Sequence, residues 1–205
     1  MKPALVSVAA LLALLACQPS IEPPVSEPIP SPTDASRHEE AATRADTAAR
    51  EFSQRLQGAL RGKMESEGPV AAIDFCHAEA PLIAAEIAAA HDVRIGRVPV
   101  PGRARNPANV ADGWQAQALR EIVARKGAGQ AGEALAFSAS EGLPGGVALR
   151  MMRPIEVQPA CLACHGKQVA PPIRDAIAAR YLGDAATGFE VGDLRGALWV
   201  EVPSR

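Results

Sequence analysis

Cys161-Leu162-Ala163-Cys164-His165 is a Cys-x-x-Cys-His stretch, the pattern through which c-type haem is attached to a polypeptide. Two intervening residues let one short turn present both sulfur atoms to the vinyl groups on one porphyrin edge. The histidine that follows is then directed at the iron as an axial ligand. The stretch therefore predicts one covalent haem c, attached through Cys161 and Cys164, with His165 as a metal ligand.

Two other chemistries use the same cysteine spacing, a structural zinc site and a redox dithiol. A structural zinc site normally needs four protein ligands, but the two remaining cysteines, Cys17 and Cys76, do not form a second pair of this kind. Proline and glycine flank the motif, which indicates a loop rather than the strand-to-helix turn of a thioredoxin-like site: Pro159, Gly166, Pro171 and Pro172. Haem attachment is favoured, with zinc and dithiol chemistry as the alternatives.

The first residues of the chain predict export. Met1-Lys2 is a short positive start, and the apolar run from Leu5 to Leu15 is too short to span a bilayer but suits a signal peptide. Leu14-Leu15-Ala16-Cys17 resembles a lipoprotein processing site, which implies that residues 1–16 are removed and that Cys17 is lipidated. An ordinary secretory signal is the alternative. We expect a lipid-anchored protein on the periplasmic side of the cell envelope, and Gln18 favours the outer membrane by the same resemblance.

Cys76 then remains without an assigned role. If Cys17 carries lipid and the motif cysteines carry haem, Cys76 has no disulfide partner in an oxidising compartment. The residues Ile73, Cys76, Ala80, Ile83 and Ile87 are spaced by three and four, which places Cys76 on the buried stripe of a helix. The thiol is therefore either inert in the core or a metal ligand.

Length and the order of the predicted elements indicate a single α+β domain that follows a tether. Residues 17–34 are rich in proline and favour an extended spacer, which leaves residues 35–205 as the domain. The net charge of −2 gives no reason to expect a nucleic-acid partner. Hydrophobic periodicity predicts helices at 35–66, from 70 onward with a break at Pro81, at 112–126 with an Asp112/Gln115 capping box, and at 173–181; strands are expected at 93–98, 134–139, 147–157 and 197–202.

The second axial ligand of the iron has several candidates in the sequence: His38, His77, His91, Met64, Met151, Met152 and Cys76. The two adjacent methionines lie in an expected strand, where a core role is more common, and His38 and His91 are typical surface residues. His77 follows Cys76 directly, but points about 100° away on a helix. These considerations rank Cys76 first and His77 second, and leave an open iron site as a further alternative.

At this point the sequence resembles a bacterial family of c-type haem-binding domains with a PAS-like fold, formerly catalogued as a domain of unknown function. The resemblance runs through blocks in a constant order: Ala72-Ile73-Asp74-Phe75-Cys76, Ala80-Pro81, Ile95-Gly96-Arg97, Arg105-Asn106-Pro107-Ala108-Asn109, Trp114, Pro154-Ile155, the haem motif with Gly166, Asp184 to Phe189 and Gly192 to Ala197. It implies a PAS-like antiparallel sheet with long N-terminal helices. It also implies iron ligation by His165 and Cys76. Val98 to Gly102 and Leu182 depart from the family pattern.

A thiolate ligand stabilises ferric iron, so the resemblance implies a low reduction potential. With two protein ligands the iron has no free position for a substrate, and we expect no enzymatic activity. The expected function is a membrane-tethered cytochrome acting as a redox-responsive sensor or a low-potential electron carrier, with an unidentified redox or signalling protein as partner. The alternatives are a haem enzyme or gas-binding protein with an open distal site, and a haem-free interaction lipoprotein.

Several arginines are candidates to neutralise the haem propionates: Arg97, Arg103, Arg105, Arg153 and Arg195. Arg105 is the most attractive of them because it opens the Arg-Asn-Pro block. A solvated cation in a loop is an equally good interpretation of Arg105.

Overall fold

The computed structural model describes residues 32–205. Its helices are α1 (Pro32–His91), α2 (Gly113–Gly127), α3 (Leu162–His165) and α4 (Pro171–Arg180), and its strands are β1 (Arg94–Pro99), β2 (Phe137–Ala139), β3 (Val147–Glu156) and β4 (Leu194–Pro203). Three short 3-10 turns, η1 (Pro107–Asn109), η2 (Gly132–Leu135) and η3 (Pro159–Cys161), complete the described elements. Within these residues, no helix is long and apolar enough to cross a membrane.

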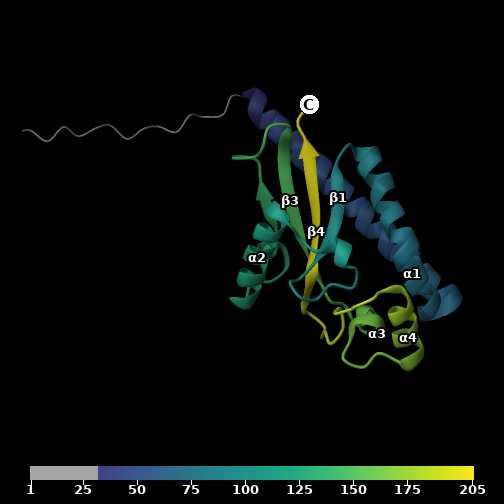
Figure 1. Cartoon of the computed structure of the whole chain (residues 1–205). Coiled ribbons are helices and arrows are strands. Elements are labelled where there is room, and N and C mark those ends of the chain that lie inside the picture. The colour runs from purple at the N-terminus through teal and green to yellow at the C-terminus, as the bar shows by residue number, and fades with distance from the viewer. Residues whose placement is uncertain (1–31) are drawn as a thin grey trace, which may run out of the picture. The chain divides into compact units, whose positions relative to one another are not determined.

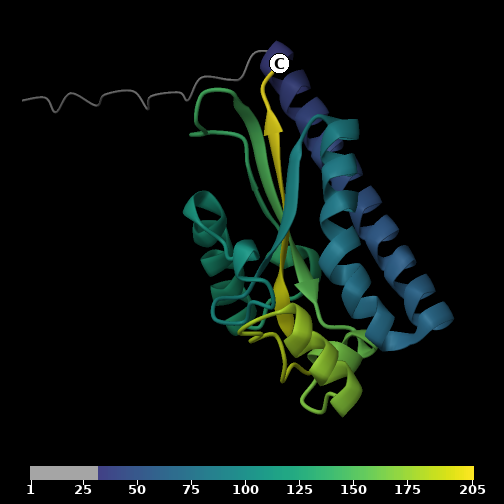
Figure 2. The same ribbon diagram turned by 45° about the vertical axis from the view of Figure 1, so that its right-hand side comes forward.

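Helix α1 is a hairpin of two helical segments rather than one straight rod (Figures 1 and 2). The chain reverses at Gly68, whose φ of 85° and ψ of 174° are not helical and suit a residue without a side chain. The two segments are joined by ion pairs across the hairpin. His91 Nε2 lies 2.7 Å from Glu51 Oε2, and Arg55 pairs with Glu86.

The strands form one antiparallel sheet in the order β1-β4-β3-β2. The last strand of the chain therefore lies in the middle, between β1 and β3. In β1, Arg97 is opposite Leu198 of β4, and Gly96 is opposite Trp199. A Cβ atom on Gly96 would lie 2.9 Å from the Trp199 ring, so glycine is required there for close packing of the indole.

Helices cover both faces of the sheet, which gives the described domain three layers (Figure 1). The first segment of α1 packs small alanines and Phe52 against one face, where strand residues such as Ile95 and Val200 are buried. Helix α2 packs Leu119 and Ile122 against the other face, beside Met152. This arrangement confirms the predicted α+β class with long N-terminal helices. The assignment to the PAS-like folds stays a prediction.

A third, smaller apolar cluster joins α4 to the second segment of α1. Its buried members are Ile73, Ile173, Ile177 and Tyr181, and Cys164 packs against them. Figures 1 and 2 show α3 and α4 side by side at one end of the sheet, next to the turn of the α1 hairpin. This cluster brings the haem motif to the helix that carries Cys76.

Most predicted elements are present, but some details of the prediction are wrong. Helix α1 begins at Pro32, inside the expected tether, and it continues through Pro81 without a break. A proline inside a helix costs about 3 kcal/mol, and here Ala80 and Ile87, buried on either side of it, hold the helix against one core. Asp112 is the N-cap residue of α2, but its side chain makes no capping hydrogen bond.

The expected strand at 134–139 is shorter than predicted. The η2 turn takes up its first half, and β2 is limited to Phe137–Ala139. The signal peptide predicted at residues 1–16, the predicted lipidation of Cys17 and most of the predicted tether lie outside the described residues.

Candidate functional site

The Cys-x-x-Cys-His motif forms a compact helical turn, not the loop that the flanking prolines and glycine predict. The η3 turn ends at Cys161, and α3 runs from Leu162 to His165. The amide of Gly166 donates to the Leu162 carbonyl at 2.9 Å and closes this turn. Pro159 is the first residue of η3. Proline favours the first position of a helical turn because its fixed φ is already close to the helical value. Helical geometry places the two cysteines and the histidine on one continuous turn.

The imidazole of His165 is fixed in one tautomer. Its Nδ1 atom lies 2.6 Å from the carbonyl oxygen of Ala186, and because a carbonyl only accepts, Nδ1 carries the proton. The Nε2 atom therefore holds the lone pair, which is the arrangement that a metal-binding histidine needs. Burial lowers the pKa of His165 to about 3, with the positive charges of Arg105 and Arg195 acting in the same direction.

Residues 186–189 clamp the motif by backbone hydrogen bonds. Phe189 N donates to the His165 carbonyl at 2.9 Å, and Gly188 N donates to the Gly166 carbonyl at 2.9 Å. A Cβ atom on Gly166 would lie 2.6 Å from the Leu162 carbonyl oxygen, so this position requires glycine. The Phe189 ring also meets the His165 ring edge-on, with centroids 6.4 Å apart. The clamp holds both the backbone and the ring of His165.

Arg105 ties the motif to a distant loop. Its Nη2 atom donates to the carbonyl oxygen of Cys164 at 2.6 Å, while its Nε atom lies 3.1 Å from Asp184 Oδ1. Both side chains are only 12 % exposed. Asp184 Oδ1 also accepts from Ala186 N at 2.9 Å, so the same carboxylate supports the residue that orients His165. Arg105 is thus a structural link in the site, rather than a solvated loop cation.

Cys76 lies on the second segment of α1, close to the motif. It is partly buried and packs against the core that α1 shares with the sheet, as its place on the apolar stripe predicts. Ile73, one turn earlier, belongs to the cluster that contains Cys164. Burial raises the pKa of the Cys76 thiol, while the nearby guanidinium of Arg97 lowers it and the charge of a Cys164 thiolate would raise it. These mutual effects place Cys76, Cys164 and Arg97 in one electrostatic neighbourhood.

Four of the other candidates for the second axial position, Met151, Met152, His91 and His77, make other contacts. Met151 and Met152 are buried in the cores on opposite faces of the sheet, and His91 pairs with Glu51. His77 is exposed, and its ring meets the edge of Tyr181 with centroids 5.2 Å apart. His38 and Met64, which are partly buried, lie on the first segment of α1.

Two arginines pack against the Phe189 ring, which contacts the His165 ring. Arg103 lies over the Phe189 ring, 3.8 Å from its centroid, and donates to the carbonyls of Ala185 and Thr187. Arg195 approaches the same ring at 5.3 Å. Arg153, another of the residues proposed from sequence, pairs instead with Asp46 of α1.

The sequence alone indicates no role for any residue of the Asp184–Phe189 block. The structure shows that Asp184 and Ala186 orient the motif, and that Tyr181 lies beside Cys76 and Arg105. Backbone acceptors such as the Ala186 carbonyl leave no signature in the residue type. In the sequence, the one signal for a role of Asp184 is that it is an acidic residue within a block shared with the family.

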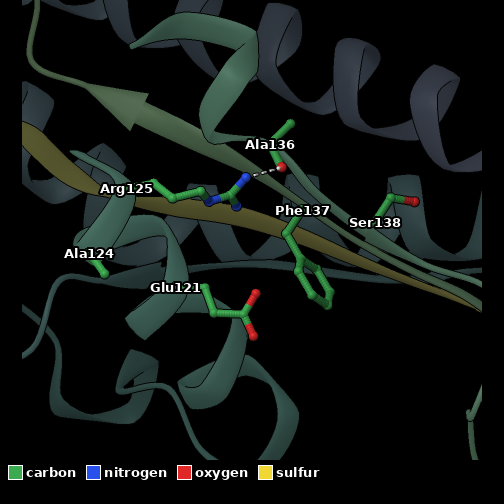
Figure 3. Close-up of a pocket in the computed structure, with 6 residues that line it drawn as sticks. All are labelled: Glu121, Ala124, Arg125, Ala136, Phe137 and Ser138. Carbon is green, nitrogen blue, oxygen red and sulfur yellow. Dashed lines mark hydrogen bonds between the residues drawn. The ribbon is translucent and has the colours of Figure 1, made fainter. Parts of the chain in front are cut away.

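Two surface hollows of about 500 Å³ each lie elsewhere, and neither is lined by a cysteine or by His165. Figure 3 shows the first, beside α2, where the Arg125 side chain reaches across to the carbonyl oxygen of Ala136. Arg125 also donates to the carbonyl of Leu135, so it fastens η2 to α2. The second hollow lies beside Trp114 and Trp199, on the sheet face that α2 covers. Neither hollow contributes to the haem-motif site.

Comparison with known proteins identifies the family. The sequence profile of the Tll0287-like family matches residues 33–203, nearly all of the described chain. The chain belongs to the Tll0287-like family. Its structure is also similar to the crystal structure of the cyanobacterial heme-protein Tll0287, with a TM-score of 0.53 and 26% sequence identity over 86% of this chain and 98% of that one. Comparison with curated proteins gave no match.

Three features of this Tll0287-like site fit a covalently attached haem. Cys76, Cys161 and Cys164 are all free thiols. His165 is neutral and presents an unprotonated Nε2 atom, as an iron ligand must. A buried polar atom near the motif, Nε of Arg195, has no hydrogen-bond partner in the described residues and is available to an anionic group, although Nε of Arg44 and of Arg125 are unpaired in the same way elsewhere.

Proposed function

We propose that this protein is a c-type cytochrome with one haem, attached through Cys161 and Cys164 and ligated by His165 and Cys76. The observation that carries the proposal is the hydrogen bond from His165 Nδ1 to Ala186, which leaves Nε2 free on the turn that bears both cysteines. The similarity to a heme-protein supports it. When bound, the haem supplies one-electron redox chemistry at iron.

The proposed ligands would give the haem a low reduction potential. A cysteine thiolate donates electron density to iron and stabilises the ferric state, so ligation by Cys76 would lower the reduction potential. Because burial keeps the free Cys76 thiol protonated, ligand binding to ferric iron would release that proton. With two protein ligands, the iron offers no position for a substrate, and we propose that the protein is not an enzyme.

Between the two redox roles, the packing around Cys76 favours an electron carrier. A carrier gains and loses one electron with both axial ligands retained, whereas a sensor reads a change of ligation. The helix that carries Cys76 is held by Ile73 and Ala80, which are each 3 % exposed on either side of it. This packing opposes a shift of the helix on reduction. A sensor would instead depend on movement of the Cys76 side chain alone, and in either role the redox partner is a separate protein.

Expression of the full chain together with the bacterial haem-attachment machinery tests the proposal. We expect one haem per chain that survives denaturation, seen as a mass increase and a Soret band. C161S/C164S should carry no covalent haem, whereas C76S, the matched control, should keep it because Cys76 forms no thioether. Absence of covalent haem from the wild-type protein would contradict the proposal.

Membrane tethering through Cys17 is a separate part of the proposal. If residues 1–16 are a lipoprotein signal peptide, the mature protein should fractionate with membranes and carry the mass of a lipid. C17S should appear instead as a soluble, exported protein that still carries haem. A wild-type protein without lipid, found in the soluble periplasmic fraction, would show an ordinary secretory signal.

A further inference from the structure

The site contains more positive charge than its own carboxylates neutralise. Arg195 lies close enough to three other arginines near the motif, Arg97, Arg103 and Arg105, for each of them to act on it electrostatically. Asp184 is the one acidic residue in this group, and it pairs with Arg105. Burial lowers the pKa of Arg195 to about 10, and repulsion from the other three arginines adds to the effect. Such a cluster is unfavourable unless an anion joins it.

Two of the four arginines already have partners. Arg105 bonds Asp184 and the Cys164 carbonyl, and Arg103 bonds the carbonyls of Ala185 and Thr187. These contacts hold loops together. Arg103, Arg97 and Arg195 all lack a carboxylate partner among residues 32–205. Of these three, Arg97 makes no side-chain hydrogen bond within this range and Arg195 makes one, so these two have the most unused donors.

Arg195 is anchored but not neutralised. Its Nη1 atom donates to the Arg103 carbonyl at 3.3 Å, and its guanidinium lies beside the Phe189 ring that meets His165. Its Nε atom is buried without an acceptor in the described structure. A buried guanidinium donor without a partner is costly, so an acceptor group next to Arg195 would be stabilising. The Nε atoms of Arg44 and Arg125 are unpaired in the same way, and Arg195 is the one of the three beside the motif.

Arg97 lies on the other side of the site, near Cys76. It projects from β1 toward the face of the sheet that α1 covers, where its guanidinium is 5.8 Å from the centre of the Phe52 ring. Arg97 is exposed at the surface, so water reaches its guanidinium, and the surrounding protein lowers its pKa by desolvation. Arg97 and Arg195 also act on each other electrostatically, so they lie in one region.

We propose that Arg97 and Arg195 form the binding site for the two carboxylate side chains of the haem, its propionates. This inference rests on the proposed function, because the carboxylates belong to the group that Cys161 and Cys164 would attach. The two carboxylates are opposite in charge to Arg97 and Arg195, the two guanidiniums of the cluster with the most unused donors. Arginine suits the role because its planar fork of donors binds a carboxylate through two hydrogen bonds.

The variants R97Q and R195Q, made in the full haem-loaded protein, test the proposal. Glutamine keeps a donor but removes the charge. Loss of a cation beside the haem stabilises the ferric state, so each variant should have a lower midpoint potential than the wild type. The propionate bending bands in resonance Raman spectra should shift in both variants. R120Q, on the exposed surface of α2, is the matched control and should change neither quantity.

The lysine variants R97K and R195K cover the case in which a glutamine variant does not fold. Lysine keeps the charge but not the forked geometry, so the potential should stay near that of the wild type while the Raman bands shift. Unchanged potential and Raman bands in a variant with full haem content would overturn the proposal and leave the cytochrome assignment intact. A lost thiolate charge-transfer band in R97Q with unshifted propionate bands would also overturn it, because Arg97 would then serve Cys76.

Discussion

The Nδ1 atom of His165 donates to the carbonyl oxygen of Ala186 at 2.6 Å, across 21 positions of the sequence. This contact orients the imidazole of His165. It places the proton on Nδ1 and leaves Nε2 unprotonated. The Ala186 amide is in turn held by Asp184, which pairs with Arg105, and Arg105 returns to the carbonyl of Cys164. The motif and the loop after α4 therefore support each other as one closed network of hydrogen bonds.

Removal of the Asp184 charge should destabilise this network. D184N breaks the ion pair with Arg105, and both side chains are 12 % exposed, so the remaining guanidinium is poorly compensated by water. We expect the free energy of unfolding to fall by about 2–3 kcal/mol, measured by denaturant titration. The double variant R105Q/D184N should be less affected than the sum of the single variants, because it leaves no unpaired charge.

A surface ion pair provides the control for that experiment. Asp74 and Arg180 also join α1 to a later part of the chain, but both side chains are about half exposed. D74N should leave the unfolding transition unchanged within error, because water replaces the lost partner. If D74N were as destabilising as D184N, the special role of the Arg105–Asp184 pair would be wrong.

Gly166→Ala tests the close contact behind the motif. The φ of −72° at Gly166 is accessible to alanine, so any effect comes from the Cβ atom, which would lie 2.6 Å from the Leu162 carbonyl oxygen. We expect a loss of about 1–3 kcal/mol in unfolding free energy and less haem per chain. G145A adds the same methyl group where nothing lies within 4 Å, and it should match the wild type.

The thiol of Cys76 should react slowly when no haem is attached. Burial raises its pKa, so at a given pH less of the reactive thiolate is present than in the unfolded chain, and the difference closes as pH rises. Alkylation rates at each cysteine, followed by peptide mass spectrometry across pH, measure this. R97Q should move the Cys76 profile to still higher pH, because Arg97 favours the thiolate. A profile equal to that of denatured protein would refute the burial argument.

Local patterns in the sequence were sufficient to predict the motif, the main helices and three of the four strands, because each depends on residue spacing along one segment. The apolar spacing around Cys76 correctly indicates a helix stripe that packs on the core. The continuity of the helix through Pro81 could not be predicted in this way. It depends on burial of Ala80 and Ile87 against strands much later in the chain.

The same limit applies to the site. The cysteine spacing predicts a haem-attachment motif, but the partner of His165 is a backbone carbonyl that any residue type would provide. The partners of the arginines could not be predicted from the sequence either. The sequence favours Arg105 among the five as a partner for a haem carboxylate, whereas the structure gives Arg105 and Arg153 acidic partners and leaves Arg97, Arg103 and Arg195 without one.

The central claim is that Cys76 and His165 are the two axial ligands of one haem iron. Near-infrared absorption of the ferric full-length protein, beside C76A and the neighbouring control H77A, tests it most directly. We expect a low-spin spectrum with a thiolate-to-iron charge-transfer band that disappears in C76A and persists in H77A. A band and spin state unchanged in C76A would contradict the account, and would make Cys76 a packing residue of α1.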